Sequence, residues 1–177
     1  MLDELLLSGQ DDIQIIVFRL GCEDYAVPIT NVQEIIIYQE ITRVPEAPSF
    51  IQGIINLRGT IIPIIDGKKK FNIYSDSDTD LDDRRIIIFD LQKETIGLIV
   101  DSVTEVIHLN IKNIEHPPID ITSETEYLWG VGKYSNKLLV LLNPDKFLSI
   151  EESGSLQSLS DVVNTIKQSK ETMLVQN

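Results

Sequence analysis

The sequence predicts an all-β protein built from two similar five-stranded modules. Isoleucine and valine fall in short runs bounded by turn residues at intervals of roughly 8–12 residues, the pattern of a β-sandwich or β-barrel. Some runs, such as Ile86–Phe89, do not alternate with polar residues, which indicates strands buried on both faces. An internal repeat doubles the pattern. These three observations together favour two related β modules over a helical protein.

Ten segments have the length and composition of strands. In chain order they are Ile13–Leu20, Tyr25–Ile29, Ile41–Val44, Gly53–Leu57, Thr60–Asp66, Arg85–Leu91, Thr95–Val100, Glu105–Leu109, Leu128–Tyr134 and Lys137–Leu142.

The segments that connect these strands carry recognisable signals. Thr30, with Gln33 three residues later, has the spacing of a capping box, so we expect a short helical turn to begin there. Pro45 and Pro48 end that region, because proline removes a backbone donor and disfavours helix in the residue before it. Arg58-Gly59 predicts a tight hairpin, since glycine adopts positive φ without strain.

The repeat appears when the chain is laid over itself. With a shift of 71 residues, Val17–Ile36 aligns without a gap over Ile88–Ile107, and six of the twenty pairs are identical. A second block, Phe50–Asp66, aligns over Tyr127–Asn143 with a shift of 77 and places Gly53 over Gly130. The identical pairs of the first block are Phe18/Phe89, Leu20/Leu91, Glu23/Glu94, Val32/Val103, Glu34/Glu105 and Ile36/Ile107.

The repeat divides the chain into a first module over residues 13–71, an acidic linker over 72–83 and a second module over 84–149, with some exchange of strands between the modules. The linker contains Ser75–Asp83, which is too charged to enter a core. Residues 150–177 are expected to form a helix, because Leu156, Leu159, Val163, Ile166 and Met173 recur at three- and four-residue steps. Its apolar face packs either on its own barrel or on a partner or second copy.

The composition excludes several classes of function. The chain has 177 residues, 42% of them hydrophobic, with a net charge of −13. That charge disfavours nucleic acid and anionic membrane surfaces as partners. Cys22 is the single cysteine, and no apolar stretch approaches the ~20 residues that span a bilayer. We therefore expect a cytoplasmic protein that does not insert into a membrane.

The sequence offers little for catalysis. His108 and His116 are the only histidines, and no cysteine or carboxylate surrounds them at a familiar metal-ligand spacing. The run Asp76, Asp78 and Asp80 imitates the start of a calcium loop, but Leu81 replaces the required glycine and Ile87 replaces the closing glutamate. We therefore expect neither an enzyme nor a metal site, and no cofactor.

Two segments have the character of recognition surfaces. Asn31–Ile37 carries more large apolar groups than one helical turn hides, and the hairpin Asn56–Gly59 places a charged side chain at an exposed tip. The alternative is that these isoleucines only fill the end of a barrel. Trp129 is likewise either an interface anchor or a core residue.

At these residues the sequence resembles the CheW family. The resemblance covers about Ile13–Leu148 and depends on the order and spacing of several motifs rather than on any one of them. The motifs are Val32–Ile35, Ile41–Pro45 and Gly53–Asp66 in the first half, and Gly97–Val103, Pro117-Pro118, Glu126–Gly130 and Leu141–Asn143 in the second.

The resemblance implies a fold and a function. The fold would be two pseudo-symmetric five-stranded barrels like Src-homology-3 (SH3) domains. The function would be that of a non-catalytic adaptor, a monomer in isolation and part of a large array, which couples the cytoplasmic tip of a chemoreceptor to the regulatory domain of the histidine kinase CheA. Receptor contact is expected at Val32, Glu34, Ile35 and Val100, and kinase contact at Gly53, Asn56, Leu57, Arg58 and Gly59.

One departure and two alternatives accompany this interpretation. After Asp66 the family usually continues with Leu-Arg, whereas this chain has Gly67-Lys68, which puts any contact of that arginine in doubt. One alternative is a stand-alone module related to the first domain of CheV, although the residues after Ser149 are too few for a receiver domain. The other is a metal-binding or ligand-binding β-barrel that uses His108, His116 and the acidic loop.

Overall fold

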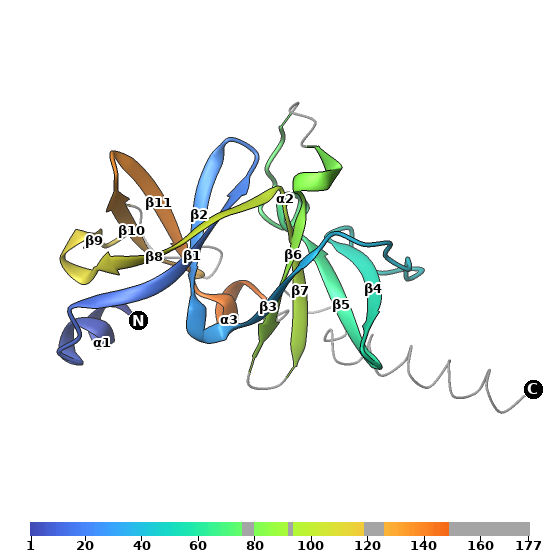
Figure 1. Cartoon of the computed structure of the whole chain (residues 1–177), viewed down its shortest axis with the longest axis horizontal. Helices are drawn as coiled ribbons and strands as arrows, with labels where there is room; N and C mark the ends of the chain where they lie inside the picture. The colour runs from blue at the N-terminus through green and yellow to red at the C-terminus, as the bar shows by residue number, and fades with distance from the viewer. Residues whose placement is uncertain (76–79, 92–93, 119–125, 149–177) are drawn as a thin grey trace, which may run out of the picture.

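The computed structural model describes residues 1–75, 80–91, 94–118 and 126–148 and is built almost entirely from β-strands. Two curved sheets lie side by side, with short helices at their ends (Figure 1). The predicted all-β class, with two barrel-like units, is confirmed. The helix expected over residues 150–177 lies outside the described residues.

The elements follow the order of the repeat. The strands are β1 Asp12–Leu20, β2 Glu23–Pro28, β3 Val32–Ile37, β4 Ile51–Leu57, β5 Thr60–Asp66, β6 Arg85–Asp90, β7 Thr95–Val100, β8 Ser102–Asn110, β9 Ile114–Glu115, β10 Leu128–Tyr134 and β11 Lys137–Leu142. The α-helices are α1 Leu2–Leu7, α2 Gly67–Lys70 and α3 Pro144–Phe147, and short 3-10 helices cover Ile29–Asn31, Leu81–Asp83 and Ile111–Asn113.

Each sheet combines strands from both halves of the chain. The first sheet has the order β8-β1-β2-β11-β10-β9, and the second has the order β3-β6-β7-β5-β4. The hairpin β1-β2 is therefore completed by strands of the second half, while the hairpin β6-β7 is completed by strands of the first half. Sheet formation thus requires residues on both sides of the 72–83 stretch.

The two sheets repeat each other down to their irregularities. In both, a hairpin pairs in parallel with the last strand of the other half, β11 with β2 and β5 with β7. The register between β3 and β6 shifts between Val32 and Glu34, and the register between β1 and β8 shifts at the matching place. A β-bulge adds one residue and bends the strand. The duplicated bulges therefore give both sheets the same curvature.

Three groups of buried side chains hold the fold together. One lies inside the first sheet and includes Trp129, and one lies inside the second and includes Ile64. The third, here called the inter-sheet core, takes residues from both sheets and from α3, among them Phe18, Phe89 and Phe147. Because β6 contributes to two of these groups, Ile86–Phe89 is buried on both faces, as its unbroken apolar run predicts.

The chain crosses between the sheets at two described places. The first crossing is the 3-10 helix Ile29–Asn31, between β2 and β3. The second is the single residue Asp101, between β7 and β8. Figure 1 shows β3 and β8 running across the middle of the molecule from these crossings. They are edge strands of the two sheets.

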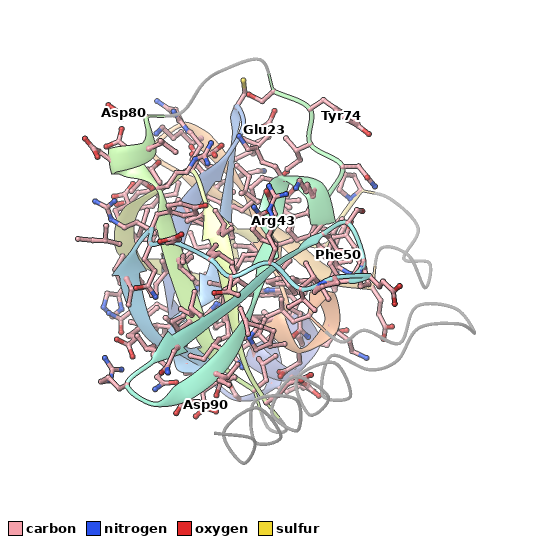
Figure 2. All side chains as sticks on the ribbon, turned by 90° about the vertical axis from the view of Figure 1, so that its right-hand side faces the viewer. Glu23, Arg43, Phe50, Tyr74, Asp80 and Asp90 are labelled. Atoms are coloured by element: carbon pink, nitrogen blue, oxygen red, sulfur yellow. The ribbon has the colours of Figure 1, made fainter. Side chains whose placement is uncertain are left out.

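Two local expectations were wrong. The predicted capping box does not form, because the 3-10 helix has Pro28 at its N-cap position and no side-chain cap. The residues that follow form strand β3 rather than a helical turn, since pairing with β6 satisfies their backbone. Ile41–Val44 is not a strand and makes only the bridge from Thr42 to Ile54. Figure 2 shows this segment, with Arg43 and Phe50, crossing the face of the molecule.

Candidate functional site

Strand β3 carries three of the predicted receptor-contact residues and divides them between its two faces. Directly opposite residues of an antiparallel pair share a face. Val32 lies opposite Phe89 and Ile35 opposite Ile87, both in the inter-sheet core, whereas Glu34 lies opposite Ile88, inside the second sheet. The bulge at this place is what brings Val32 and Ile35 to the same face.

The exposure of this face increases along β3. Val32 is partly buried against the inter-sheet core, Ile35 is 37% exposed and Ile37, on the same face, is 71% exposed. Large apolar side chains on an edge strand with that much exposure are characteristic of a binding surface. We call Val32, Ile35 and Ile37 the β3 strip.

On the other face of β3, Glu34 binds the tip of the β4-β5 hairpin. Both terminal guanidinium nitrogens of Arg58 donate to the Glu34 carboxylate, Nη1 to Oε2 at 3.3 Å and Nη2 to Oε1. Such a two-point contact fixes orientation as well as charge. The second sheet is thereby closed at its rim, since β3 and β4 are its two edge strands. This contact joins one predicted receptor residue to one predicted kinase residue.

The hairpin tip has the conformation that its sequence predicts. Arg58 has φ +50° and Gly59 has φ +88°, the positive values that a two-residue type I′ turn requires. The Asn56 side chain accepts a hydrogen bond from the Gly59 N–H at 2.8 Å. Asn56, Arg58 and Gly59 are exposed, while Leu57 packs partly against the core of the second sheet. The tip therefore presents polar groups on an apolar base.

Two residues expected at the site lie below the surface. Val100 is fully buried in the inter-sheet core, so it supports the site from beneath and offers no surface to a partner. Gly53 is also buried, with φ +150°, and a Cβ there would overlap the carbonyl oxygen of Thr42. The missing side chain at Gly53 lets the Thr42 backbone come close enough to β4 to form its bridge with Ile54. The remaining predicted residues, from β3 and from the hairpin, lie together at the rim of the second sheet.

Strand β8 has a second apolar strip that the sequence analysis did not select. Val103 packs against the inter-sheet core, and Val106, opposite Ile16 of that core, is 48% exposed. These residues are the repeat counterparts of Val32 and Ile35 at a shift of 71. The repeat alignment was therefore the signal in the sequence that could have identified them. We call Val103 and Val106 the β8 strip.

The two histidines of the metal-binding alternative each face a different aspartate, while Asp76 and Asp78 of its acidic loop lie outside the described residues. His108 faces Asp12, with 3.8 Å between Nδ1 and Oδ2, and His116 faces Asp3, with 3.4 Å between Nε2 and Oδ1. Within the described ranges no group of three or more His, Cys, Asp and Glu side chains surrounds a common point. No helix of the described residues is long and apolar enough to cross a membrane.

Comparison with known proteins identifies the family of this chain. The pattern of the CheW-like domain matches residues 14–152. The chain belongs to the CheW family. Two relatives called chemotaxis protein CheW, from Klebsiella aerogenes and Bacillus subtilis, are 35% and 34% identical to it over 151 and 143 residues. Those alignments cover 83% and 80% of this chain and 88% and 90% of the relatives.

A solved CheW structure has the same fold. The crystal structure of the scaffolding protein TtCheW from Thermoanaerobacter tengcongensis matches with a TM-score of 0.72 and 39% sequence identity. The match covers 82% of this chain and 98% of that protein. In this CheW-family chain the family match includes β3, the hairpin tip and β8, whereas α1 lies before its first residue. The two strips and the Arg58 tip therefore lie within the part of the chain that matches the CheW-like domain.

Proposed function

We propose that the chain is a non-catalytic, cytoplasmic chemotaxis adaptor that couples the tip of a chemoreceptor to the regulatory domain of the histidine kinase CheA. Membership of the CheW family supports the chemotaxis role, and the TtCheW relative is itself described as a scaffolding protein. The observation that carries the proposal is an apolar strip with exposed members on each of the edge strands β3 and β8, together with a charged hairpin tip next to β3. Such surfaces bind proteins rather than small molecules.

The β3 strip is the proposed receptor contact. A chemoreceptor tip is a helical bundle, and a helix presents apolar side chains along one stripe. Val32, Ile35 and Ile37 form a matching row that begins at the inter-sheet core and continues into solvent. An amphipathic helix laid along that row removes apolar surface from water on both sides of the contact. Glu34, on the opposite face, joins the strand to the hairpin tip through Arg58.

The β4-β5 hairpin tip is the proposed kinase contact. Arg58, Asn56 and Gly59 are exposed there, and Leu57 and Gly53 shape the backbone beneath them. Arginine presents a rigid fork of donors that discriminates between partners. A moderate affinity at each contact suits an array, because linked contacts raise the overall strength without any new interaction.

Binding of the full-length chain to two purified partners tests the proposal. A receptor-tip fragment and the CheA regulatory domain are titrated separately and together, with the Kd measured by calorimetry. Arg58→Glu is expected to weaken kinase-domain binding about tenfold or more, which is about 1.4 kcal/mol, because it reverses the charge at the tip and expels Glu34. Its folded state is retained, since an exposed ion pair contributes less than about 1 kcal/mol.

Ser135→Glu provides the matched control. Ser135 occupies the same position in the β10-β11 hairpin as Arg58 does in the β4-β5 hairpin, also with positive φ. The Ser135→Glu variant is expected to bind both partners as the unaltered chain does. Ile37→Glu, at the exposed end of the β3 strip, is expected to weaken binding of the receptor-tip fragment and to leave binding of the kinase domain unchanged. Normal binding of both partners by Arg58→Glu and Ile37→Glu would contradict the assignment.

A further inference from the structure

The second crossing between the sheets contains a buried charge that the adaptor function does not explain. Asp101 is 3% exposed and stands between β7 and β8. Its carboxylate accepts a hydrogen bond from the Gly21 N–H at 2.7 Å and lies 3.2 Å from the ammonium of Lys68. Its own N–H donates to the carbonyl oxygen of Arg19 at 2.9 Å. A buried carboxylate without such partners is strongly unfavourable.

These contacts tie together elements of both sheets. Arg19 and Gly21 belong to the end and turn of the β1-β2 hairpin, in the first sheet, and Lys68 belongs to α2, which directly follows β5 of the second sheet. Asp101 connects them at the point where the chain passes from one sheet to the other. We call Asp101, Lys68 and the Gly21 N–H the Asp101 clamp.

The departure at Gly67-Lys68 fits this clamp. A Cβ at residue 67 would lie 2.8 Å from the Ile99 carbonyl oxygen and 2.9 Å from a methyl group of Leu20, so only glycine allows α2 to come this close to the crossing. With α2 this close, the Lys68 ammonium reaches Asp101, and the Lys68 side chain is 23% exposed. Lys68 therefore has a partner within this chain.

The first crossing has no equivalent contact. The repeat counterpart of Asp101 is Thr30 at a shift of 71, and that of Lys68 is Asp145 at a shift of 77. Thr30 is exposed, and its hydroxyl makes a long contact of 3.5 Å to the neighbouring Asn31 side chain. Asp145 is exposed on α3. Among the described residues, the buried ion pair between the sheets therefore stands at one crossing only.

We propose that the Asp101 clamp fixes the start of β8 and that β3 is the strand that moves when a partner helix binds. The β8 strip begins two residues after Asp101, so the clamp is a positioning device for Val103 and Val106. The β3 strip follows the unclamped crossing. Beyond its pairing with β6, strand β3 is tied by the contact of Arg58 with Glu34 at the exposed tip, which is easier to break than the buried clamp, so β3 is the strand that adjusts to the helix. The statement about the partner rests on the proposed function and adds the β8 strip, which packs on the same inter-sheet core as the β3 strip, to the receptor contact. The clamp itself is independent of it.

Amide hydrogen exchange of the full-length chain, followed by NMR, tests the clamp directly. In the unaltered protein the amides of β3 that pair with β6 are expected to exchange about tenfold or more faster than those of β8 that pair with β1. In Lys68→Met, which keeps the aliphatic stem, the Gly21 amide is expected to exchange at least about tenfold faster, because the carboxylate is left buried and unpaired.

Lys68→Arg is expected to restore the protection of Gly21, since it keeps the charge. Lys69→Met is the matched control, because among the described residues the Lys69 ammonium donates to the Gln52 side chain at 3.2 Å and not to the clamp. The exchange rates of this variant should equal those of the unaltered chain. Unchanged Gly21 protection in folded Lys68→Met overturns the proposal. Should Lys68→Met fail to fold, equal exchange of β3 and β8 in the unaltered chain overturns it instead.

The receptor-tip fragment supplies the second measurement. Lys68→Met is expected to weaken its binding about threefold to tenfold, because the conformation with a correctly placed β8 strip becomes a fraction of the population, and Lys68→Arg is expected to restore it. If the unaltered chain does not bind the fragment, the proposed function fails while Gly21 exchange still decides the clamp. If Gly21 protection falls in Lys68→Met but binding is unchanged, the clamp stands and its positioning role is overturned.

Discussion

The two halves of the chain have the same backbone and different chemistry. Both carry the same bulges, the same parallel pairing between halves and hairpin tips with two successive positive φ values. The first half has Arg58 at its tip where the second has Ser135, and the second has Asp101 at its crossing where the first has Thr30. The bulges, the parallel pairing and the hairpin turns close each sheet, so a change in one of them disturbs the whole sheet. The side chains at the surface and at the crossings can change one at a time. The two similar halves therefore form one fold with two unequal sides.

The largest expected effect concerns the exchange of strands between the halves. Prepared as separate polypeptides, residues 1–79 and 80–177 are each expected to lack a cooperative unfolding transition, because neither contains all the strands of a sheet. Mixing them is expected to restore the native β spectrum, which circular dichroism and a thermal scan would follow. A cooperative transition in residues 1–79 alone would show that the first half forms a barrel by itself.

The next comparison is between Trp129 and its repeat counterpart Gln52. Trp129 is buried, and its indole N–H donates to the Leu142 carbonyl oxygen at 3.1 Å. Trp129→Gln is expected to lower the free energy of unfolding by about 3–4 kcal/mol, through lost burial and a cavity. Gln52→Ala, at the half-buried equivalent position, should lower it by less than about 1 kcal/mol. Urea titration measures both, and similar losses would mean that the two positions are equivalent after all.

Gly53 and Gly130 are aligned glycines with different surroundings. Gly53→Ala is expected to lower the free energy of unfolding by about 3 kcal/mol, because the residue has positive φ and its new methyl group would meet backbone. Gly130→Ala should lower it by about 1–2 kcal/mol, since the nearest atom, at 2.8 Å, belongs to the Ile114 side chain. Denaturant midpoints decide the order, and a larger loss at Gly130 would contradict it.

The smallest expected effect concerns the β10-β11 hairpin tip, which has Ser135 where the β4-β5 tip has Arg58. Glu105 is the repeat counterpart of Glu34, and Ser135 has φ +46°, close to that of Arg58. Ser135→Arg is expected to raise the free energy of unfolding by about 0.5 kcal/mol, the usual value of an exposed ion pair. A double-mutant cycle with Glu105→Gln measures the coupling. Zero coupling would show that the β10-β11 tip does not approach β8 as the β4-β5 tip approaches β3.

The sequence predicted the fold class because its signals are redundant. Strand-length apolar runs, the repeat and the turn at Arg58-Gly59 all agree with one architecture. The capping box at Thr30 failed because it is a local signal, and the β-branched run Ile35–Ile37 that follows gains more from pairing with β6. Ile41–Val44 has strand composition, but Pro45 and the positive φ of Glu46 turn the chain away after it.

The site was only partly predictable. The hairpin tip follows from two adjacent residues, and its exposure could be expected. The burial of Val100 could not, because an unbroken apolar run does not reveal which of its residues face a second sheet. The Asp101 clamp joins three segments far apart in sequence. Such contacts depend on the final packing and leave no local pattern.

The exchange of strands also determines when folding can be completed during synthesis. When a ribosome has released only the first half, β1 and β2 have formed no sheet with β8 or β11, and β3 has no β6 to pair with. The nascent chain then exposes apolar hairpins and open strand edges, the features that make intermediates prone to aggregation. The second sheet can close only after β7 has been released, and the first only after β11. Translation rate and chaperone access are therefore expected to affect the yield of this protein more than that of two barrels arranged in series.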